Sequence, residues 1–146
     1  MFLLDTDHLV IIQQKTQPEF AALAEAMGNY SRSDFHVSIV SFHEQVLGWS
    51  TYLSRAKSAE SVVRAYSKFE GILIDFAALQ ICPFDARAAE VFDSLRAARV
   101  RVGTMDLRIA ATAIACGYEV LTRNLADFQK VPGLRAADWT IARYGV

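Results

Sequence analysis

Short apolar runs alternate with amphipathic segments along most of the chain, which is typical of strands that alternate with helices. Buried strands are predicted at residues 2–4, 37–40, 80–82 and 118–122, with a last strand at 139–142. Helical patterns fill most of the sequence between them. Because parallel neighbours need crossover helices, this order predicts an α/β domain of three layers, α/β/α, with a mainly parallel central sheet.

The predicted helices begin and end at residues that favour helix ends. Pro18 and Gly28 bound one helix, Ser41 and Asp85 begin two others, and Gly117 ends the helix that follows Gly103. These residues place most helix starts directly after a predicted strand.

The longest helix is expected at residues 58–79, where apolar residues recur at alternating spacings of four and three. This stripe is expected to pack on the core, or to form, with the apolar residues before it, a helical hairpin whose groove accepts a partner helix or a second subunit. The residues of the stripe are Val62, Tyr66, Phe69, Leu73 and Phe76.

Four acidic residues lie just past a predicted strand or in the first turn of a predicted helix. They are Asp5, Glu44, Asp106 and Asp127. In a parallel α/β sheet the carboxyl ends of the strands form one edge, and ligands bind there. Mg²⁺ prefers oxygen ligands and neutralises carboxylates that would otherwise repel one another. The sequence therefore predicts a divalent-cation site at this edge.

Each acid also has an ordinary structural interpretation. Residues 41–44 fit the S-x-x-E capping box, in which Glu44 reaches back to the helix start. Asp106 and Asp127 lie in first turns, where a carboxylate interacts favourably with the helix dipole, and Asp5 or Thr6 could cap the first helix. Capping explains each residue separately, but it does not explain why all four lie at one edge.

Four segments resemble the motifs of PIN domains and, among these, of the VapC-type toxin ribonucleases of bacterial toxin–antitoxin pairs. The segments are 3–9 (LLDTDHL), 38–44 (SIVSFHE), 106–113 (DLRIAATA) and 121–128 (LTRNLADF), and the similarity runs from residue 2 to about Leu134. The resemblance implies a PIN-like fold, Mg²⁺ or Mn²⁺ as cofactor, and endonucleolytic hydrolysis of RNA. It also implies a cognate antitoxin protein and a homodimer as partners.

The same four acids are the expected catalytic residues, with Asp5 and Asp106 as metal ligands and Glu44 as a ligand or as the base that orients water. Asp127, with Asn124, is expected to lie outside the first ligands of the metal or to bind a second metal. Many relatives carry the fourth acid where this chain has Asn124. Either Asp127 supplies the fourth carboxylate, or Asn124 binds through its amide oxygen or through a water.

Neighbouring residues carry weaker indications. Asp7, where relatives often have Asn, is expected to hydrogen-bond the backbone rather than to enlarge the acidic pocket. The hydroxyls of Thr6 and Thr122 could hold the carboxylates or the scissile phosphate, or could belong to ordinary capping and strand residues. Three basic residues near the motifs could neutralise RNA phosphates, namely Arg108, Arg123 and Lys130.

Composition narrows the function classes. With 146 residues, 53% of them hydrophobic and 21% charged, residues 1–146 are expected to form one globular domain. The net charge of −1 is unevenly distributed, since residues 1–86 carry 6 basic and 10 acidic side chains whereas residues 87–146 carry 9 and 6.

Cys82 and Cys116 are expected to be buried, and neither they nor the histidines have the spacing of a zinc site.

No membrane span or signal peptide is expected, because no apolar run approaches about 18 residues and Asp5 comes too early for a signal sequence. The expected location is therefore cytoplasmic.

Two other functions fit part of the sequence. Residues 2–7 resemble the strand and DxD opening of haloacid-dehalogenase-type phosphatases, in which Asp5 would become phosphorylated. The other alternative is a noncatalytic PIN-like module that binds RNA or protein. Asn124, in place of an acid, is compatible with this alternative because it would weaken the metal site.

Overall fold

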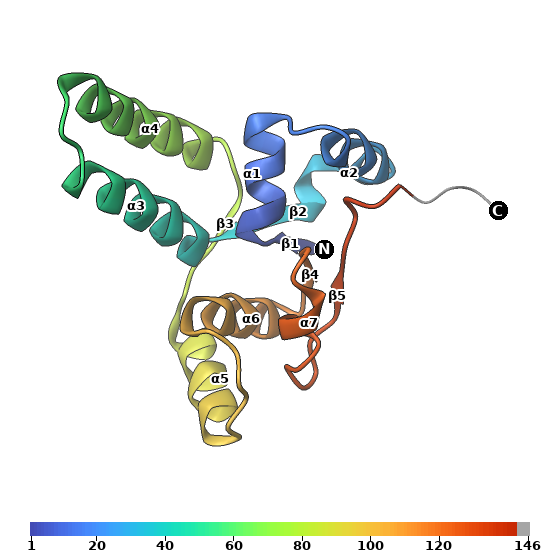
Figure 1. Ribbon diagram of the computed structural model, residues 1–146. Helices are drawn as coiled ribbons and strands as arrows, with labels where there is room; N and C mark the ends of the chain where they lie inside the picture. The colour runs from blue at the N-terminus through green and yellow to red at the C-terminus, as the bar shows by residue number, and fades with distance from the viewer. Residues whose placement is uncertain (143–146) are drawn as a thin grey trace.

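The computed structural model describes residues 1–142 and has a five-stranded parallel sheet between two layers of helices (Figure 1). The strands are β1 (Phe2–Leu4), β2 (Phe35–Ser38), β3 (Ile81–Cys82), β4 (Glu119–Leu121) and β5 (Ala136–Ala137). They lie in the order β3-β2-β1-β4-β5, and each neighbouring pair is parallel. The predicted three-layer α/β/α architecture is confirmed.

Seven α-helices and one 3₁₀ turn connect the strands within these residues. They are α1 (Thr6–Gln14), α2 (Glu19–Met27), the 3₁₀ turn η1 (Arg32–Asp34), α3 (Ile39–Ser54), α4 (Ala59–Ala77), α5 (Ala86–Ala97), α6 (Thr104–Cys116) and α7 (Leu125–Phe128). In Figure 1, α1 to α4 lie on one side of the sheet and α5 to α7 on the other.

Two apolar cores result, because successive side chains of a strand point to opposite faces. Leu3 of β1 packs with Val120 and with buried residues of α5, α6 and α7, whereas Phe2 and Leu4 pack with α1, β2 and α4. The helix layers therefore hold the short strands from both sides, and this rigid sheet positions the residues that follow each strand.

The register brings three strand ends together. Leu4 is the partner of Val37 on β2 and of Leu121 on β4. The backbone N–H of Asp5 also donates to the carbonyl of Leu121 (2.9 Å). Asp5 and Thr122 thus directly follow β1 and β4, and Ser38 ends β2, at the same edge of the sheet.

The strand predicted at residues 37–40 is wrong in its second half. Strand β2 ends at Ser38, whose hydroxyl accepts the N–H of Val40 (3.0 Å) and caps α3. Ile39 and Val40 have side chains typical of strands, but this buried cap makes them the first residues of a helix. Helix α3 therefore starts at Ile39 and not at the predicted Ser41.

The last predicted strand, at residues 139–142, is also wrong, since the final strand is the two-residue β5. The N–H of Trp139 donates to Nε2 of His8 (3.3 Å), and the N–H of Thr140 donates to Oδ1 of Asp138 (2.8 Å). Side chains take up these backbone donors, so the donors do not extend the sheet.

The predicted apolar stripe lies on α4 but is only partly buried. Phe76 is buried, whereas Tyr66 and Leu73 are 60% and 65% exposed. Together with the exposed Val63 and Ile74 they leave an apolar face on α4, which pairs with α3 as a hairpin extending from the body of the molecule (Figure 1).

Two further expectations concern cysteines and membranes. Cys82 is buried as expected, but Cys116, at the end of α6, is exposed. Among residues 1–142 there is no helix with the length and apolar character that a membrane crossing needs.

Candidate metal centre

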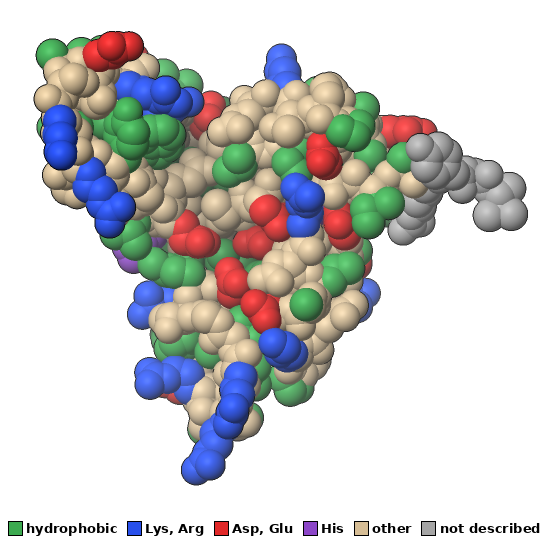
Figure 2. Space-filling view, in the orientation of Figure 1, with side chains coloured by type: hydrophobic (Ala, Val, Ile, Leu, Met, Phe, Trp, Pro, Cys, Tyr) green, Lys and Arg blue, Asp and Glu red, His purple; other side chains and the backbone are tan. Residues whose placement is uncertain are grey.

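Three of the four predicted acids converge at the carboxyl edge of the sheet. Asp5 follows β1, Glu44 lies in the second turn of α3 and Asp106 lies in the first turn of α6. One carboxylate oxygen from each lies within 4.8 Å of the others. Figure 2 shows acidic side chains gathered in a hollow, with lysine and arginine side chains on either side of it.

Asp5 is the most deeply buried of the three acids, at 5% exposed. Its Oδ1 accepts the N–H of Thr6 (2.8 Å), so it caps α1, and its Oδ2 accepts the hydroxyl of Thr122 (2.8 Å). Burial, followed by the charge of Asp7, raises the pKa of Asp5 from 3.8 to about 7, although these two hydrogen bonds lower it. At neutral pH this carboxyl is therefore balanced between its charged and neutral forms.

Glu44 does not belong to a capping box, because α3 begins at Ile39 and Ser38 is its cap. Instead, Oε1 of Glu44 accepts the hydroxyl of Thr6 (2.9 Å), which also lies 3.0 Å from the hydroxyl of Ser41. Burial and then the charge of Asp106 raise the pKa of Glu44, against the hydrogen bond from Thr6. The capping interpretation of Glu44 is wrong, and its carboxylate faces the other acids.

Asp106 lies beyond Gly103, which precedes α6 without a side-chain cap. Burial and the charge of Asp127 raise the pKa of Asp106, while a hydrogen bond from Asn124 lowers it. Nδ2 of Asn124 donates to Oδ2 of Asp106 (3.3 Å) and to Oδ2 of Asp127 (3.1 Å). Asn124 thus joins these two carboxylates through its amide nitrogen.

Asp127 lies next to the group of three acids but is not one of them. Its Oδ1 accepts Nζ of Lys130 (2.8 Å), and its side chain is 35% exposed. Hydrogen bonds from Lys130 and Asn124 lower the pKa of Asp127, so this acid carries its charge more readily than the other three.

The predictions for Thr6, Thr122 and Asp7 are confirmed as hydrogen bonds. Both hydroxyls donate to site carboxylates, as described above, and Oδ2 of Asp7 accepts the backbone N–H of Arg123 (2.9 Å). Oδ1 of Asp7 contacts Nδ1 of His8 (2.8 Å). Burial raises the pKa of Asp7, but the hydrogen bonds from His8 and from the N–H of Arg123 outweigh it, and the pKa lies below its usual value.

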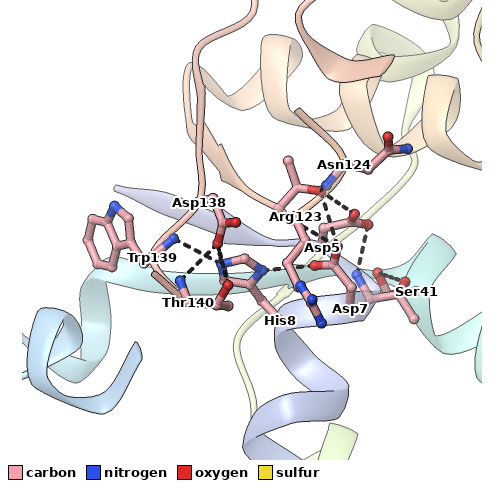
Figure 3. A network of polar contacts seen from close by, with 11 residues as sticks. Asp5, Asp7, His8, Ser41, Arg123, Asn124, Asp138, Trp139 and Thr140 are labelled. Carbon is pink, nitrogen blue, oxygen red and sulfur yellow. Dashed lines mark hydrogen bonds and ion pairs between the residues drawn. The ribbon is translucent and has the colours of Figure 1, made fainter. Parts of the chain in front are cut away.

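The contacts of His8 were not predicted from the sequence. His8 is fully buried, and its ring connects Asp7 with residues 138–140 (Figure 3). The one sequence signal for this role was a polar residue, His8, on the otherwise apolar buried face of α1. Its partners at residues 138–140 are more than 100 positions away, so no local pattern could have indicated them.

The chemistry of this donor set fits a hard divalent cation. Its three nearest groups are carboxylates, which suit Mg²⁺ and Mn²⁺ better than the nitrogen and sulfur ligands that zinc sites usually contain. Burial and mutual repulsion raise the pKa values of Asp5, Glu44 and Asp106. Neutralisation by a cation or a proton relieves this repulsion.

A basic hollow lies beside the helix that carries Asp106. Cζ of Arg96 and Cζ of Arg108 lie 5.7 and 5.6 Å from the ring centre of Phe92. Both arginines line a cavity of about 320 Å³ together with Thr104, and neither forms an ion pair within residues 1–142. Two like charges share one aromatic ring there without an acidic partner.

Comparison with known proteins identifies the family. A family model described as PIN domain matches residues 2–134. The chain belongs to the PIN-domain family. The resemblance to its VapC members is confirmed by a relative named tRNA(fMet)-specific endonuclease VapC, from Salmonella typhimurium, which is 30% identical over 94% of this chain and 97% of its own length. Ribonuclease VapC1 of Rickettsia felis is 46% identical over 46 residues, which is 34% of that protein.

Solved PIN-domain structures agree with this assignment. The crystal structure of DNA-bound VapBC from Salmonella typhimurium superposes with a TM-score of 0.71 and 28% identity, over 94% of this chain and 97% of that one. VapBC-1 from nontypeable Haemophilus influenzae has a TM-score of 0.72 over 96% and 98% of the two chains, but at 18% identity it supports the fold alone.

Membership of the PIN-domain family argues against the phosphatase alternative. In the DxD opening of that alternative, the second Asp, here Asp7, would act as the acid/base beside Asp5. In this PIN domain both oxygens of Asp7 already accept hydrogen bonds, from His8 and from the N–H of Arg123.

Proposed function

We propose that this PIN domain is a metal-dependent endoribonuclease and the toxin of a VapBC-type toxin–antitoxin pair. The convergence of Asp5, Glu44 and Asp106 within 4.8 Å is the observation that carries the proposal. The 30% identity to an endonuclease over nearly the whole of both chains supports the choice of reaction. Two cores that share one sheet support a single domain over the described residues.

Asp5 and Asp106 would hold Mg²⁺ or Mn²⁺ directly, and Glu44 would act as a third ligand or orient the attacking water. A bound ion of this kind polarises a phosphodiester oxygen and makes water deprotonate near neutral pH. Asp5 contributes a charge that is strongly disfavoured without a counter-ion, because burial raises its pKa to about 7. The site is thus built to bind positive charge.

The other polar residues would keep these carboxylates in place. Thr122 donates to Asp5, Thr6 donates to Glu44, and Asn124 donates to both Asp106 and Asp127. Asp127 would act further from the ion, because Lys130 already shares its charge. This arrangement gives the fourth acid a supporting role in which it sets the position and charge of Asp106.

RNA would approach along the basic side chains that flank the acidic hollow. Arg96 and Arg108 lack acidic partners within residues 1–142. Arg123 comes directly after Thr122, whose hydroxyl donates to Asp5. Contacts of this kind neutralise phosphates without reading bases. Binding would therefore depend on salt more than on sequence.

An antitoxin and a second copy of the chain would be the protein partners. Structural relatives of this PIN domain are VapBC complexes. The chain itself exposes large apolar side chains along α4, which is the kind of surface that accepts an amphipathic helix or a dimer partner. The exposed residues are Val63, Tyr66, Leu73 and Ile74.

The test is cleavage of total cellular RNA by the purified, antitoxin-free protein at low salt with Mg²⁺ or Mn²⁺. We expect cleavage by the wild type and a loss on the order of 100-fold or more for Asp5→Asn and Asp106→Asn, since even partners of metal ligands cost 10–100-fold. Asp93→Asn is the matched control, because Asp93 is exposed on α5 and forms no ion pair within residues 1–142.

Melting curves must show that both site variants are folded. Wild-type protein that binds RNA but cleaves none with either metal would establish the noncatalytic binding module instead.

A further inference from the structure

His8 is a buried titratable residue without a part in the proposed hydrolysis. It lies on the first turn of α1, is 0% exposed, and has polar partners on both sides of its ring. One side faces Asp7, next to the acidic site, and the other faces residues 138–140 near the end of the described chain (Figure 3). Both ring nitrogens of His8 therefore have a polar contact, one toward the acidic site and one toward the end of the described chain.

The contacts determine which ring nitrogen carries the hydrogen. Nε2 lies 3.3 Å from the backbone nitrogen of Trp139, which can only donate, so Nε2 accepts. The hydrogen of the neutral ring is therefore on Nδ1, which donates to Oδ1 of Asp7 (2.8 Å). The ring thus links the backbone of Trp139 to the carboxylate of Asp7.

Trp139 gives this link a fixed end. Its indole stacks on the ring of Tyr30, with centroids 5.3 Å apart, and meets the ring of Phe2 edge-on at 4.7 Å. Asp138 is held by Thr140, whose N–H and hydroxyl both donate to its Oδ1 (2.8 and 2.6 Å). His8 therefore rests against a segment that the aromatic cluster anchors.

Asp7 passes the constraint to the acidic site. Its Oδ2 accepts the N–H of Arg123 (2.9 Å) and lies 3.4 Å from the hydroxyl of Thr122. That hydroxyl donates to Oδ2 of Asp5 (2.8 Å) and accepts the N–H of Asn124 (2.9 Å). The turn after β4 is thus tied to α1 through the side chain that His8 holds.

We propose that His8 is a positioning residue, which orients Asp7 and so fixes the turn that places Thr122 and Asn124 on the acidic site. The effect of His8 on metal binding and cleavage rests on the proposed function. Its effect on the position of the turn does not, because the contacts that fix the turn involve neither metal nor RNA. Residues that orient metal ligands typically affect metal affinity by about 10–100-fold.

Two substitutions separate the two ends of the ring. In His8→Asn the amide nitrogen occupies the place of Nδ1, so the donor to Asp7 remains while the acceptor for Trp139 is removed. In His8→Gln the amide reaches the place of Nε2, so the acceptor for Trp139 remains while the donor to Asp7 is removed. The readouts are amide hydrogen exchange at Arg123 and at Trp139, and Mn²⁺ affinity measured by calorimetry with Mn²⁺ alone.

We expect faster exchange at Arg123 and Mn²⁺ affinity lowered about 10-fold in His8→Gln only, and faster exchange at Trp139 in His8→Asn only. Equal effects of both variants on the Arg123 amide and on Mn²⁺ affinity would show that His8 serves only to fill the core. No change at Arg123 in His8→Gln would also overturn the proposal.

A measurement on the wild type guards against variants that fail to fold. Nitrogen NMR of the His8 ring must show a protonated Nδ1 and an unprotonated Nε2, and the reverse tautomer would refute the link. A wild type that cleaves no RNA would refute the nuclease but not the role of His8, which the exchange at Arg123 still decides.

Discussion

Replacing Asp5 with Asn should abolish metal binding and yet stabilise the metal-free protein at neutral pH. Asp5 is almost fully buried beside other acids, and its pKa is raised from 3.8 to about 7. The folded protein therefore binds more protons at this group than the unfolded protein does. The favourable contribution of the neutral carboxyl is fully present below about pH 4 and is lost as the pH rises to about 7.

The size of the effect follows from the pKa. Raising the pKa from 3.8 to about 7, at ~1.4 kcal/mol for each tenfold change, corresponds to about 4 kcal/mol of destabilisation above pH 7. Asn has no charge, and it caps helices about as well as Asp does. One of the two hydrogen bonds, from Thr6 or from Thr122, loses its acceptor, which costs about 1 kcal/mol. The net gain expected at pH 8 is about 2–3 kcal/mol.

The assay is urea unfolding of both proteins in a chelator at several pH values between 4 and 8. Glu44 and Asp106 also have raised pKa values, so both proteins should lose stability with rising pH, and the difference between them isolates Asp5. Mn²⁺ at 1,000 times its Kd should reverse the order of stability, because a ligand at that concentration stabilises by about 4.1 kcal/mol, which exceeds the gain expected for the Asn variant, and only the wild type should bind it. A difference that does not grow from pH 5 to pH 8, or an Asn variant less stable at pH 8, would refute the reasoning.

Three other predictions test separate parts of the structure. Thr122→Val should raise the pKa of Asp5 above about 7, because the hydroxyl that favours the charged form is removed, and an NMR titration of the carboxyl measures this. Ser38→Ala should lower the free energy of unfolding by about 1 kcal/mol through loss of the α3 cap, whereas Ser67→Ala on the exposed side of α4 should change it little. The double variant Arg96→Gln and Arg108→Gln should reduce the dependence of RNA binding on salt, by about 0.7 in the logarithmic slope for each phosphate that the variant no longer neutralises. An unchanged slope would remove these arginines from the RNA path.

The site was predictable from the sequence as far as it depends on strand ends. Asp5 follows the apolar strand at residues 2–4, and a parallel sheet brings such strand ends to one edge. Asp106 follows no strand, because α6 comes after α5 and a loop, and its sequence signal was its place in the first turn of the helix that begins after Gly103. Glu44 was predicted correctly to lie at this edge, but the helix start assumed for it, Ser41, was wrong. The S-x-x-E pattern at Ser41 imitates a helix start, while the true cap is Ser38, which is buried and looks like a strand residue.

The remaining features depend on contacts that no local pattern contains. His8 meets Trp139, and Asp7 meets Arg123, across more than 100 residues of sequence. Residues 139–142 have side chains suited to a strand, yet the backbone donors of Trp139 and Thr140 bind side chains. The stripe on α4 has helical spacing, but the spacing cannot say how much of it the sheet covers, and Tyr66 and Leu73 stay exposed.

The strand nearest the start of the sequence, β1, lies in the middle of the sheet, between β2 and β4. Since a ribosome delivers residues in order, β1 has only one neighbour until β4 has been synthesised. Asp106 and the hydroxyl of Thr122 that binds Asp5 also arrive late. Unfinished copies that end before β4 therefore lack Thr122 and the turn that follows it, and their acidic site is incomplete.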